Sequence, residues 1–273
     1  MDNRPIGVFD SGLGGLSCLK ELERELPHEN LIYFGDTART PYGDKTPETI
    51  RYFTCQVADF LVSQGVKMLV IACNTISALC TDLLRERHPD IIVVDIITPT
   101  VSHLTAKKHD KAIGVIATKA TINSGLYEKL LYEGGVDTKV YSKACPLFVP
   151  LIEGGFREGV VAETVSKHYL DEIVPGNNVG SLILGCTHYP FMQEAIKKNF
   201  PELELINPAT ILSDEVKNIL TEKDMLNTDE TAGKRLFFAS DLSETFTDMV
   251  KSINSDENYD IKTKTFQENY QSF

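Results

Sequence analysis

The alternation of short apolar segments with amphipathic helical segments constrains the fold of this chain more than any other feature. An apolar run at residues 6–9 is followed by a glycine-rich stretch and by leucines at helical spacing, at Leu16, Leu19, Leu22 and Leu26. The same order recurs, with apolar runs at 67–73, 112–118 and 181–186 that lead into helical patterns at 74–87, 121–133 and 189–200. Because a crossover helix must return over the sheet between parallel strands, this alternation predicts an α/β fold with mostly parallel sheets flanked by helices.

Two parts of the sequence resemble each other, which suggests two similar domains. Residues 6–8 match residues 113–115, and residues 69–75 match residues 182–188, at offsets of 107 and 113 residues. The second match places Cys73 and Cys186 at the ends of equivalent strands. Chance similarity between short apolar strands is the alternative explanation.

The domain boundaries follow from the positions of these units. We expect a first α/β domain from residues 1–98 plus 208–273 and a second from residues 99–207. The strand pattern at 236–240 and the helical pattern at 243–253 are too few to form a third domain, so we expect them to complete the first.

The net charge excludes several classes of function. With 27 Lys and Arg against 39 Asp and Glu, the formal charge is −12, which disfavours nucleic acid as a partner. The longest apolar runs are far shorter than the roughly 20 residues that cross a bilayer, and no signal segment opens the chain. The six cysteines lack the spacing of a disulfide framework, which indicates reduced thiols and a cytoplasmic protein. From the short apolar runs we also expect no membrane partner.

Small polar residues gather where the predicted strands end. These are Asp10-Ser11, Cys73-Asn74-Thr75, Thr118 and Cys186-Thr187-His188. Ligands of open α/β sheets bind at these strand ends, where helix N-termini offer unpaired N–H groups. A thiol at a helix N-terminus can have a lowered pKa, so Cys73 and Cys186 are candidates for chemistry.

Other cysteines and the glycine-rich loop have simpler explanations. Cys18, Cys55 and Cys80 lie in helical stretches and are expected to pack in the core, as is Cys145. No cysteine pair has zinc-site spacing, so we expect no metal. The loop lacks the third glycine of the dinucleotide fingerprint, and the chain has no P-loop. The loop glycines either allow a tight strand-to-helix turn or let the backbone bind an anion; they are Gly12, Gly14 and Gly15.

The remaining polar candidates also have structural interpretations. Asp10 could cap the following helix, and His188 could be an ordinary histidine at a helix start. Glu153 could be a solvated loop charge. Pro41-Tyr42-Gly43 is typical of a turn, and Thr46-Pro47 predicts the start of a helix.

Four stretches taken together resemble the glutamate racemases. They are Val8–Gly15, Pro41-Tyr42-Gly43, Cys73-Asn74-Thr75 and Leu184–Pro190, and the resemblance extends from about Ile6 to Ile253. It implies an enzyme that interconverts L- and D-glutamate for peptidoglycan synthesis without a cofactor. Its active site would lie in the cleft between two α/β domains, with glutamate as the small-molecule partner and a homodimer as a possible assembly. The tail beyond Asn254 matches no pattern.

The resemblance also implies roles for individual residues. Cys73 and Cys186 would be the catalytic thiols, with Asp10 supporting the first and Glu153 and His188 supporting the second. The substrate contacts would be Asp10, Ser11, Tyr42, Gly43, Asn74, Thr75, Thr118, Thr121, Thr187 and His188. Inverting a stereocentre by proton transfer needs a base on one face of the α-carbon and an acid on the other, which explains a duplicated thiol. Cys73 would deprotonate D-glutamate and Cys186 L-glutamate.

Three alternatives remain at this point. An aspartate racemase would keep the fold and change the substrate, although relatives acting on aspartate tend to have an acidic residue where this chain has His188. A hydrolase with Cys186 as nucleophile and a histidine as base would leave Cys73 unexplained. A non-catalytic amino-acid binder would use the cleft but needs no paired thiols.

Overall fold

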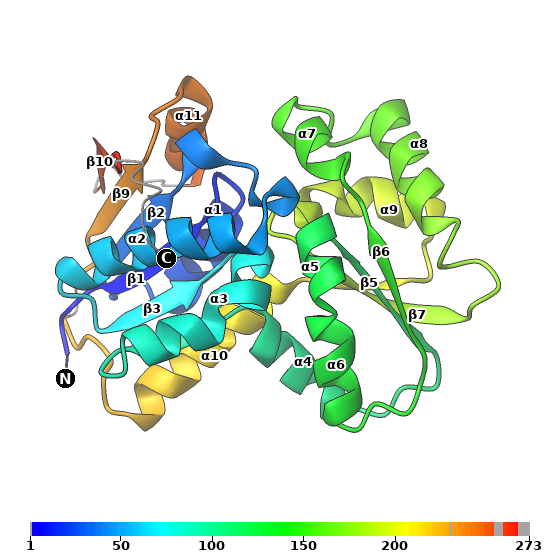
Figure 1. Cartoon of the computed structure of the whole chain (residues 1–273), viewed down its shortest axis with the longest axis horizontal. Coiled ribbons are helices and arrows are strands. Elements are labelled where there is room, and N and C mark those ends of the chain that lie inside the picture. Colours follow the sequence, from blue (N-terminus) through cyan, green and yellow to red (C-terminus); the bar gives the residue numbers. More distant parts are fainter. Residues whose placement is uncertain (1, 230, 254–258, 267–273) are drawn as a thin grey trace.

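The computed structural model describes residues 2–229, 231–253 and 259–266. It contains two parallel sheets flanked by helices, arranged side by side in Figure 1. The α/β prediction, with mostly parallel sheets, is therefore confirmed.

The first sheet has six strands in the order β10-β9-β2-β1-β3-β4, and every neighbouring pair is parallel. Its strands are β1 (Ile6–Asp10), β2 (Leu31–Gly35), β3 (Met68–Ile71), β4 (Ile92–Asp95), β9 (Arg235–Ala239) and β10 (Tyr259–Thr263). All residues of β1, β2 and β3 are buried, as expected for parallel strands covered on both faces. The C-terminal strands β9 and β10 extend this sheet beside β2, and β10 lies in the tail for which the sequence offered no pattern.

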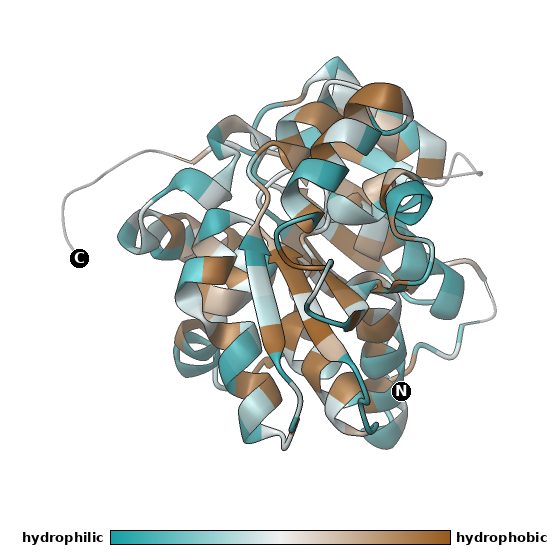
Figure 2. Ribbon diagram, turned by 90° about the vertical axis from the view of Figure 1, so that its right-hand side faces the viewer, coloured by the Kyte–Doolittle hydropathy of each residue, from teal (hydrophilic) through white to brown (hydrophobic). Residues whose placement is uncertain are grey.

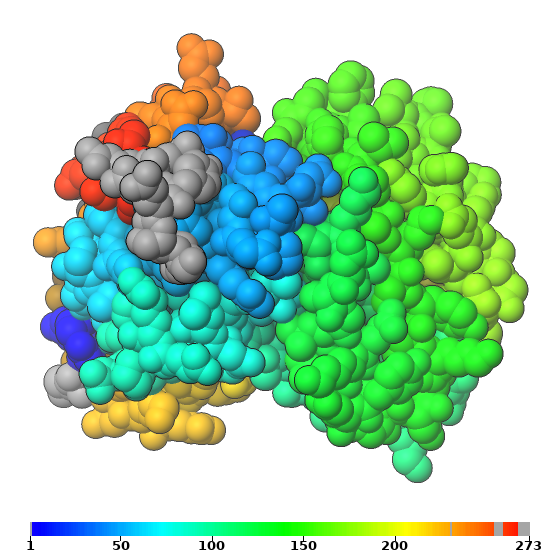
Figure 3. Space-filling model, viewed as in Figure 1, coloured from blue at the N-terminus to red at the C-terminus, as the bar shows by residue number. Residues whose placement is uncertain are grey.

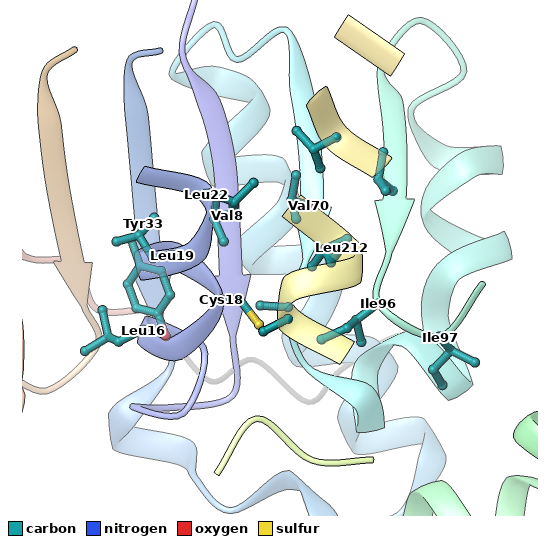
Figure 4. Packing of buried hydrophobic residues seen from close by; sticks show 14 of the residues in the cluster. Val8, Leu16, Cys18, Leu19, Leu22, Tyr33, Val70, Ile96, Ile97 and Leu212 are labelled. Atoms are coloured by element: carbon teal, nitrogen blue, oxygen red, sulfur yellow. The ribbon is translucent and has the colours of Figure 1, made fainter. Parts of the chain in front are cut away.

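Helices cover the first sheet on both faces. They are α1 (Leu16–Glu25), α2 (Pro47–Ser63), α3 (Asn74–Arg87), α4 (Ile97–Thr105), α10 (Pro208–Glu222) and α11 (Glu244–Ile253). One core lies under α1, α4, α10 and α11, and the other lies under α2 and α3. Figure 4 shows the first core, where Leu212 of α10 reaches Val70 and Ile96. Thr46 is the N-cap of α2 as predicted, because its hydroxyl accepts a hydrogen bond from the Thr49 N–H at 3.3 Å.

The second sheet has four parallel strands in the order β6-β5-β7-β8. They are β5 (Ala112–Ala117), β6 (Val140–Ala144), β7 (Val179–Gly185) and β8 (Glu204–Ile206), and the helices around them are α5 (Lys119–Ser124), α6 (Leu126–Glu133), α7 (Phe148–Glu153), α8 (Gly159–Leu170) and α9 (Gln193–Asn199). In Figure 2 the central strands are mostly brown and the outer faces of the helices carry much of the teal. In each sheet the strands of the proposed repeat are neighbours, β1 beside β3 and β5 beside β7.

Two helices differ from the sequence prediction. The prediction of a single helix over residues 121–133 is wrong. Gly125 adopts a left-handed conformation (φ 66°) and separates α5 from α6. The helix expected at 189–200 begins instead as a 3₁₀ turn over Tyr189–Met192. Pro190 lies in that turn, and the α-helix starts only at Gln193.

None of the helices in the described ranges is both long and apolar enough to cross a membrane.

We predict that Leu212→Ala lowers the free energy of unfolding by about 2–5 kcal/mol, because it leaves a cavity in a fully buried position between α10 and the first sheet. Urea unfolding measures this change. Asn218→Ala, on the exposed face of the same helix, should change the free energy of unfolding by no more than about 0.5 kcal/mol. Equal effects of the two substitutions would contradict the packing described for α10.

Candidate active site

Two thiols lie at the carboxyl ends of equivalent strands. Cys73 follows β3 and is the N-cap residue of α3, and Cys186 directly follows β7. Their exposed fractions are only 5% and 7%. Both line the same cavity between the two sheets, so the repeated strand–cysteine pattern brings two thiols together from residues 113 positions apart.

The surroundings of Cys73 favour the neutral thiol. Its Sγ lies 3.5 Å from the Ser11 hydroxyl oxygen, to which it donates a hydrogen bond. Burial raises the pKa of the Cys73 thiol well above its usual value, and the negative charge of Asp10 raises it further. A hydrogen bond from the Ile76 N–H at the start of α3 lowers this pKa, but by less. The expectation that the helix N-terminus lowers the pKa of Cys73 is therefore wrong.

Cys186 has a different neighbour, the imidazole of His188. Cys186 Sγ lies 3.9 Å from His188 Nδ1, and His188 Nε2 lies 3.0 Å from Glu153 Oε1. Burial lowers the pKa of His188, but the hydrogen bonds with Cys186 and Glu153 outweigh burial and raise this pKa to about 10. Both hydrogen bonds favour the protonated form of the imidazole. His188 does stand at a helix start, before the 3₁₀ turn Tyr189–Met192, but it is buried and both ring nitrogens have partners in the site. Glu153 lies at the end of α7 rather than in a loop.

Asp10 is the last residue of β1 and only 1% exposed. Its carboxylate accepts hydrogen bonds from the Gly12 N–H at 3.0 Å and from the Thr187 hydroxyl at 3.4 Å. The helix-cap interpretation of Asp10 is wrong, because α1 begins only at Leu16. Asp10 instead fixes the turn after β1 and reaches across to the residue after Cys186.

Three threonine hydroxyls form a triangle between the two domains. Thr75 Oγ1 lies 2.9 Å from Thr118 Oγ1 and 3.3 Å from Thr121 Oγ1, and the last two are 3.0 Å apart. Thr118 is also the N-cap of α5, accepting a hydrogen bond from the Thr121 N–H. These contacts connect the start of α3 to the start of α5.

The turn at Pro41-Tyr42-Gly43 forms the 3₁₀ segment Tyr42–Asp44. The Tyr42 hydroxyl donates a hydrogen bond to Asp36, and Asp36 is held by an ion pair with Arg39 at 2.8 Å. The phenol group is thus already paired within the first domain. A Cβ at Gly43 would lie 2.8 Å from Thr118 Cβ, so a residue without a side chain allows this turn to approach the second domain.

The two domains also meet beside Cys186. The Ser17 hydroxyl donates to the Thr187 carbonyl at 3.0 Å. A Cβ built at Gly14 would lie 2.2 Å from Thr187 Oγ1 and 2.4 Å from His188 Nδ1. In the space-filling view of Figure 3, the blue segment that carries Tyr42 lies directly against the green second domain.

The cavity between the thiols is small, about 20 Å³, roughly the room that one water molecule needs. A larger hollow of about 550 Å³ lies along α3 and α6, but neither Cys73 nor Cys186 lines it. The structure is therefore a closed form of the site.

Most of the predicted site residues line this cavity. They are Ser11, Tyr42, Gly43, Cys73, Asn74, Thr75, Thr118, Cys186, Thr187 and His188. Asp10, Glu153 and Thr121 do not line it but contact residues that do. Three further residues of the lining were not predicted as site residues, namely Thr40, Pro41 and Val149. Ser17 and Tyr127, which contact site residues of the opposite domain, were not predicted either. No local pattern identifies such residues, because their contacts depend on how the two domains meet.

Within residues 2–229, 231–253 and 259–266, no group of three or more His, Cys, Asp or Glu side chains is arranged to hold a metal ion.

Known proteins resemble this chain over nearly its whole length. Residues 6–216 match the Asp/Glu/Hydantoin racemase family. A glutamate racemase of Sulfurihydrogenibium sp. is 40% identical over 264 residues, covering 96% of this chain and 97% of its own, and one of Neisseria meningitidis is 39% identical over 239 residues, covering 88% of each chain. The crystal structure of glutamate racemase from Francisella tularensis in complex with D-glutamate superposes with a TM-score of 0.89 at 42% identity, covering 96% of this chain and 98% of that one.

Three observations lead to one conclusion: two thiols line one cavity, the fold has two α/β domains, and the relatives match over nearly the whole chain. The chain belongs to the Asp/Glu/hydantoin racemase family and, within it, to the glutamate racemases.

Proposed function

We propose that this racemase interconverts L- and D-glutamate by a two-thiol mechanism, in which Cys73 and Cys186 act on opposite faces of the substrate α-carbon. The observation that carries the proposal is the position of the two thiols. They come from equivalent strand ends in facing domains and line one cavity. The D-glutamate formed supplies peptidoglycan synthesis.

The two thiols have different roles in each direction. With L-glutamate, Cys186 takes the α-proton and Cys73 donates a proton to the other face; with D-glutamate the roles exchange. The surroundings of the thiols support this assignment. The raised pKa favours the protonated form of Cys73, which is the form that donates, and the raised pKa of His188 favours a positively charged imidazole 3.9 Å from Cys186 Sγ.

Hydrogen-bond donors at the helix starts stabilise the transition state. Removing a proton beside a carboxylate moves negative charge onto the carboxylate oxygens, and fixed donors offset that charge. Asn74 and Thr75 are the first two residues of α3 and line the cavity. Ser11 and Thr187 line it as well. In a dry site these hydrogen bonds are stronger than in water.

Substrate entry requires the domains to open. Glutamate is much larger than the one water molecule that the closed cavity can hold. Opening and reclosure are therefore steps of every turnover, and reclosure excludes water before proton transfer.

The proposal places the enzyme in the cytoplasm, as a homodimer. The location is supported by six cysteines that are all free and buried, because disulfides are rare in reducing compartments. Size-exclusion chromatography with light scattering checks the dimer.

The substrate is tested by a chiral product assay with L-glutamate and L-aspartate offered separately. We expect D-glutamate from the first and no D-aspartate from the second. Faster turnover of aspartate would favour the aspartate racemase alternative.

Activity should persist after exhaustive dialysis against a chelator, because the thiol pair accounts for both proton transfers. Glutamate turnover before and after dialysis measures this. Activity that returns only when pyridoxal phosphate, a nicotinamide or a metal is added would contradict the mechanism.

Replacing one thiol should stop racemisation but leave proton removal from one enantiomer. We predict that Cys73→Ser and Cys186→Ser each lower net racemisation by about 10²- to 10⁴-fold, the usual contribution of a general acid or base. In deuterated water, Cys73→Ser should still exchange the α-proton of L-glutamate through Cys186, and Cys186→Ser that of D-glutamate through Cys73. Proton NMR measures both exchanges.

Cys80→Ala is the matched control for the thiol variants, since Cys80 is a buried thiol of α3 that does not line the cavity. It should keep racemisation near the wild-type rate. Equal exchange of both enantiomers in both serine variants would mean that one base serves both faces, and the two-thiol mechanism would then be wrong.

Gly14→Ala should hold the domains apart. The new methyl group would meet the Thr187 hydroxyl and the His188 ring at less than 2.5 Å, so closure carries an overpacking cost of about 1–3 kcal/mol. We expect kcat/KM to fall about 10- to 100-fold while the thermal unfolding midpoint changes little.

Gly12→Ala in the same turn is the control, because its nearest neighbour is the Thr40 hydroxyl at 3.0 Å, within the first domain. It should have a much smaller effect on kcat/KM. Equal losses of kcat/KM in the two variants would show that any added side chain in this turn lowers activity, and that domain closure is not the cause.

A further inference from the structure

A buried tyrosine of the second domain makes a hydrogen bond to the residue after Cys73. Tyr127 lies in α6 and is 3% exposed. Its hydroxyl donates to Asn74 Oδ1 at 2.7 Å. Asn74 is the first residue of α3 in the first domain and is 2% exposed. The contact therefore crosses between the domains, and both side chains are shielded from water.

The other end of the Asn74 amide has no partner within the part of the chain that the structure describes. Its Nδ2 is buried and makes no hydrogen bond to any of the residues that the structure describes. An amide nitrogen carries two N–H donors, and a buried donor left unpaired costs free energy, so such groups are rare without a function. Asn74 lines the cavity between the thiols, where an acceptor on a bound ligand can satisfy these donors.

The Tyr127 hydroxyl is available as a donor throughout the physiological range. Burial raises the pKa of Tyr127 well above its usual value, and the charge of Asp95 raises it further. The phenol therefore keeps its proton and pairs with the amide oxygen of Asn74. With that oxygen held, the nitrogen must occupy the other end of the amide.

We propose that Tyr127 is a positioning residue: by holding Asn74 Oδ1 from across the cleft, it directs Asn74 Nδ2 toward a carboxylate oxygen of the bound substrate. The inference rests on the proposed function, since it assigns a task in glutamate binding. Because Tyr127 lies in α6 and Asn74 begins α3, the orientation of the Asn74 amide depends on how these two helices pack against each other.

A double-mutant cycle tests this assignment. Tyr127→Phe removes the hydroxyl but keeps the ring, and we expect KM for both enantiomers to rise about tenfold while kcat changes less than about threefold, because the hydrogen bond to the carboxylate already exists in the bound ground state. In an Asn74→Ala background, Tyr127→Phe should raise KM by less than about twofold, since the group that it orients is gone.

Tyr169→Phe is the matched control. Tyr169 is a buried tyrosine of the same domain whose hydroxyl accepts a hydrogen bond from the Leu147 N–H at 3.3 Å, away from the cavity. It should leave KM unchanged. Thermal unfolding midpoints of all variants show whether any loss comes from the fold rather than from binding.

The outcomes separate the inference from the proposed function. Wild-type turnover of glutamate tests the proposed function alone, and its absence would overturn both. If the wild type is active but Tyr127→Phe raises KM by the same factor with and without Asn74, Tyr127 acts on the fold and the inference is wrong. A fall in kcat without a rise in KM would also overturn it.

Discussion

A carbanion at the α-carbon of an amino acid is planar, and racemisation requires a proton to leave one face and arrive at the other. Two acid–base groups must therefore lie on opposite sides of one atom. A single strand end offers such a group from one side only. In the mechanism proposed for this chain, Cys73 after β3 and Cys186 after β7 supply the two groups, because both thiols line one cavity between the sheets. The buried cores, the crossing connections and the tight approach at Gly14 and Gly43 all serve to hold those two strand ends together.

The two halves are similar in topology but not in electrostatics. Cys73 lies beside the carboxylate of Asp10 and donates to a neutral hydroxyl, whereas Cys186 lies beside an imidazole that Glu153 helps keep protonated. One side of the cavity therefore favours a neutral thiol, and the other places a charged imidazole near the second sulfur. In the proposed mechanism, the cationic ammonium group of the substrate changes both environments, because a nearby positive charge favours the thiolate.

Much of this arrangement could be predicted from the sequence, and the exceptions share a physical cause. Continuous apolar strands that end in Cys73 and Cys186 predicted both the fold class and the position of the thiols, because the carboxyl ends of parallel strands share an edge. Local patterns could not show that Gly125 interrupts a helix or that Asp10 faces Thr187 instead of capping α1. They also could not show that burial outweighs the helix N-terminus at Cys73. No local sequence pattern marked Tyr127 as a site residue, because its partner Asn74 is 53 positions earlier in the sequence and in the other domain.

The narrow cavity around the two thiols also has a consequence for chemical durability. Oxidants attack the thiolate form of cysteine, and they must reach the sulfur to do so. While the domains are closed, the cavity has room for about one water molecule and both thiols are more than nine-tenths buried. Cys73 is in addition held as the less reactive thiol. If the domains open and close during turnover as proposed, peroxide reaches the two thiols mainly while the domains are open, so the rate of their oxidation depends on how often the cleft opens.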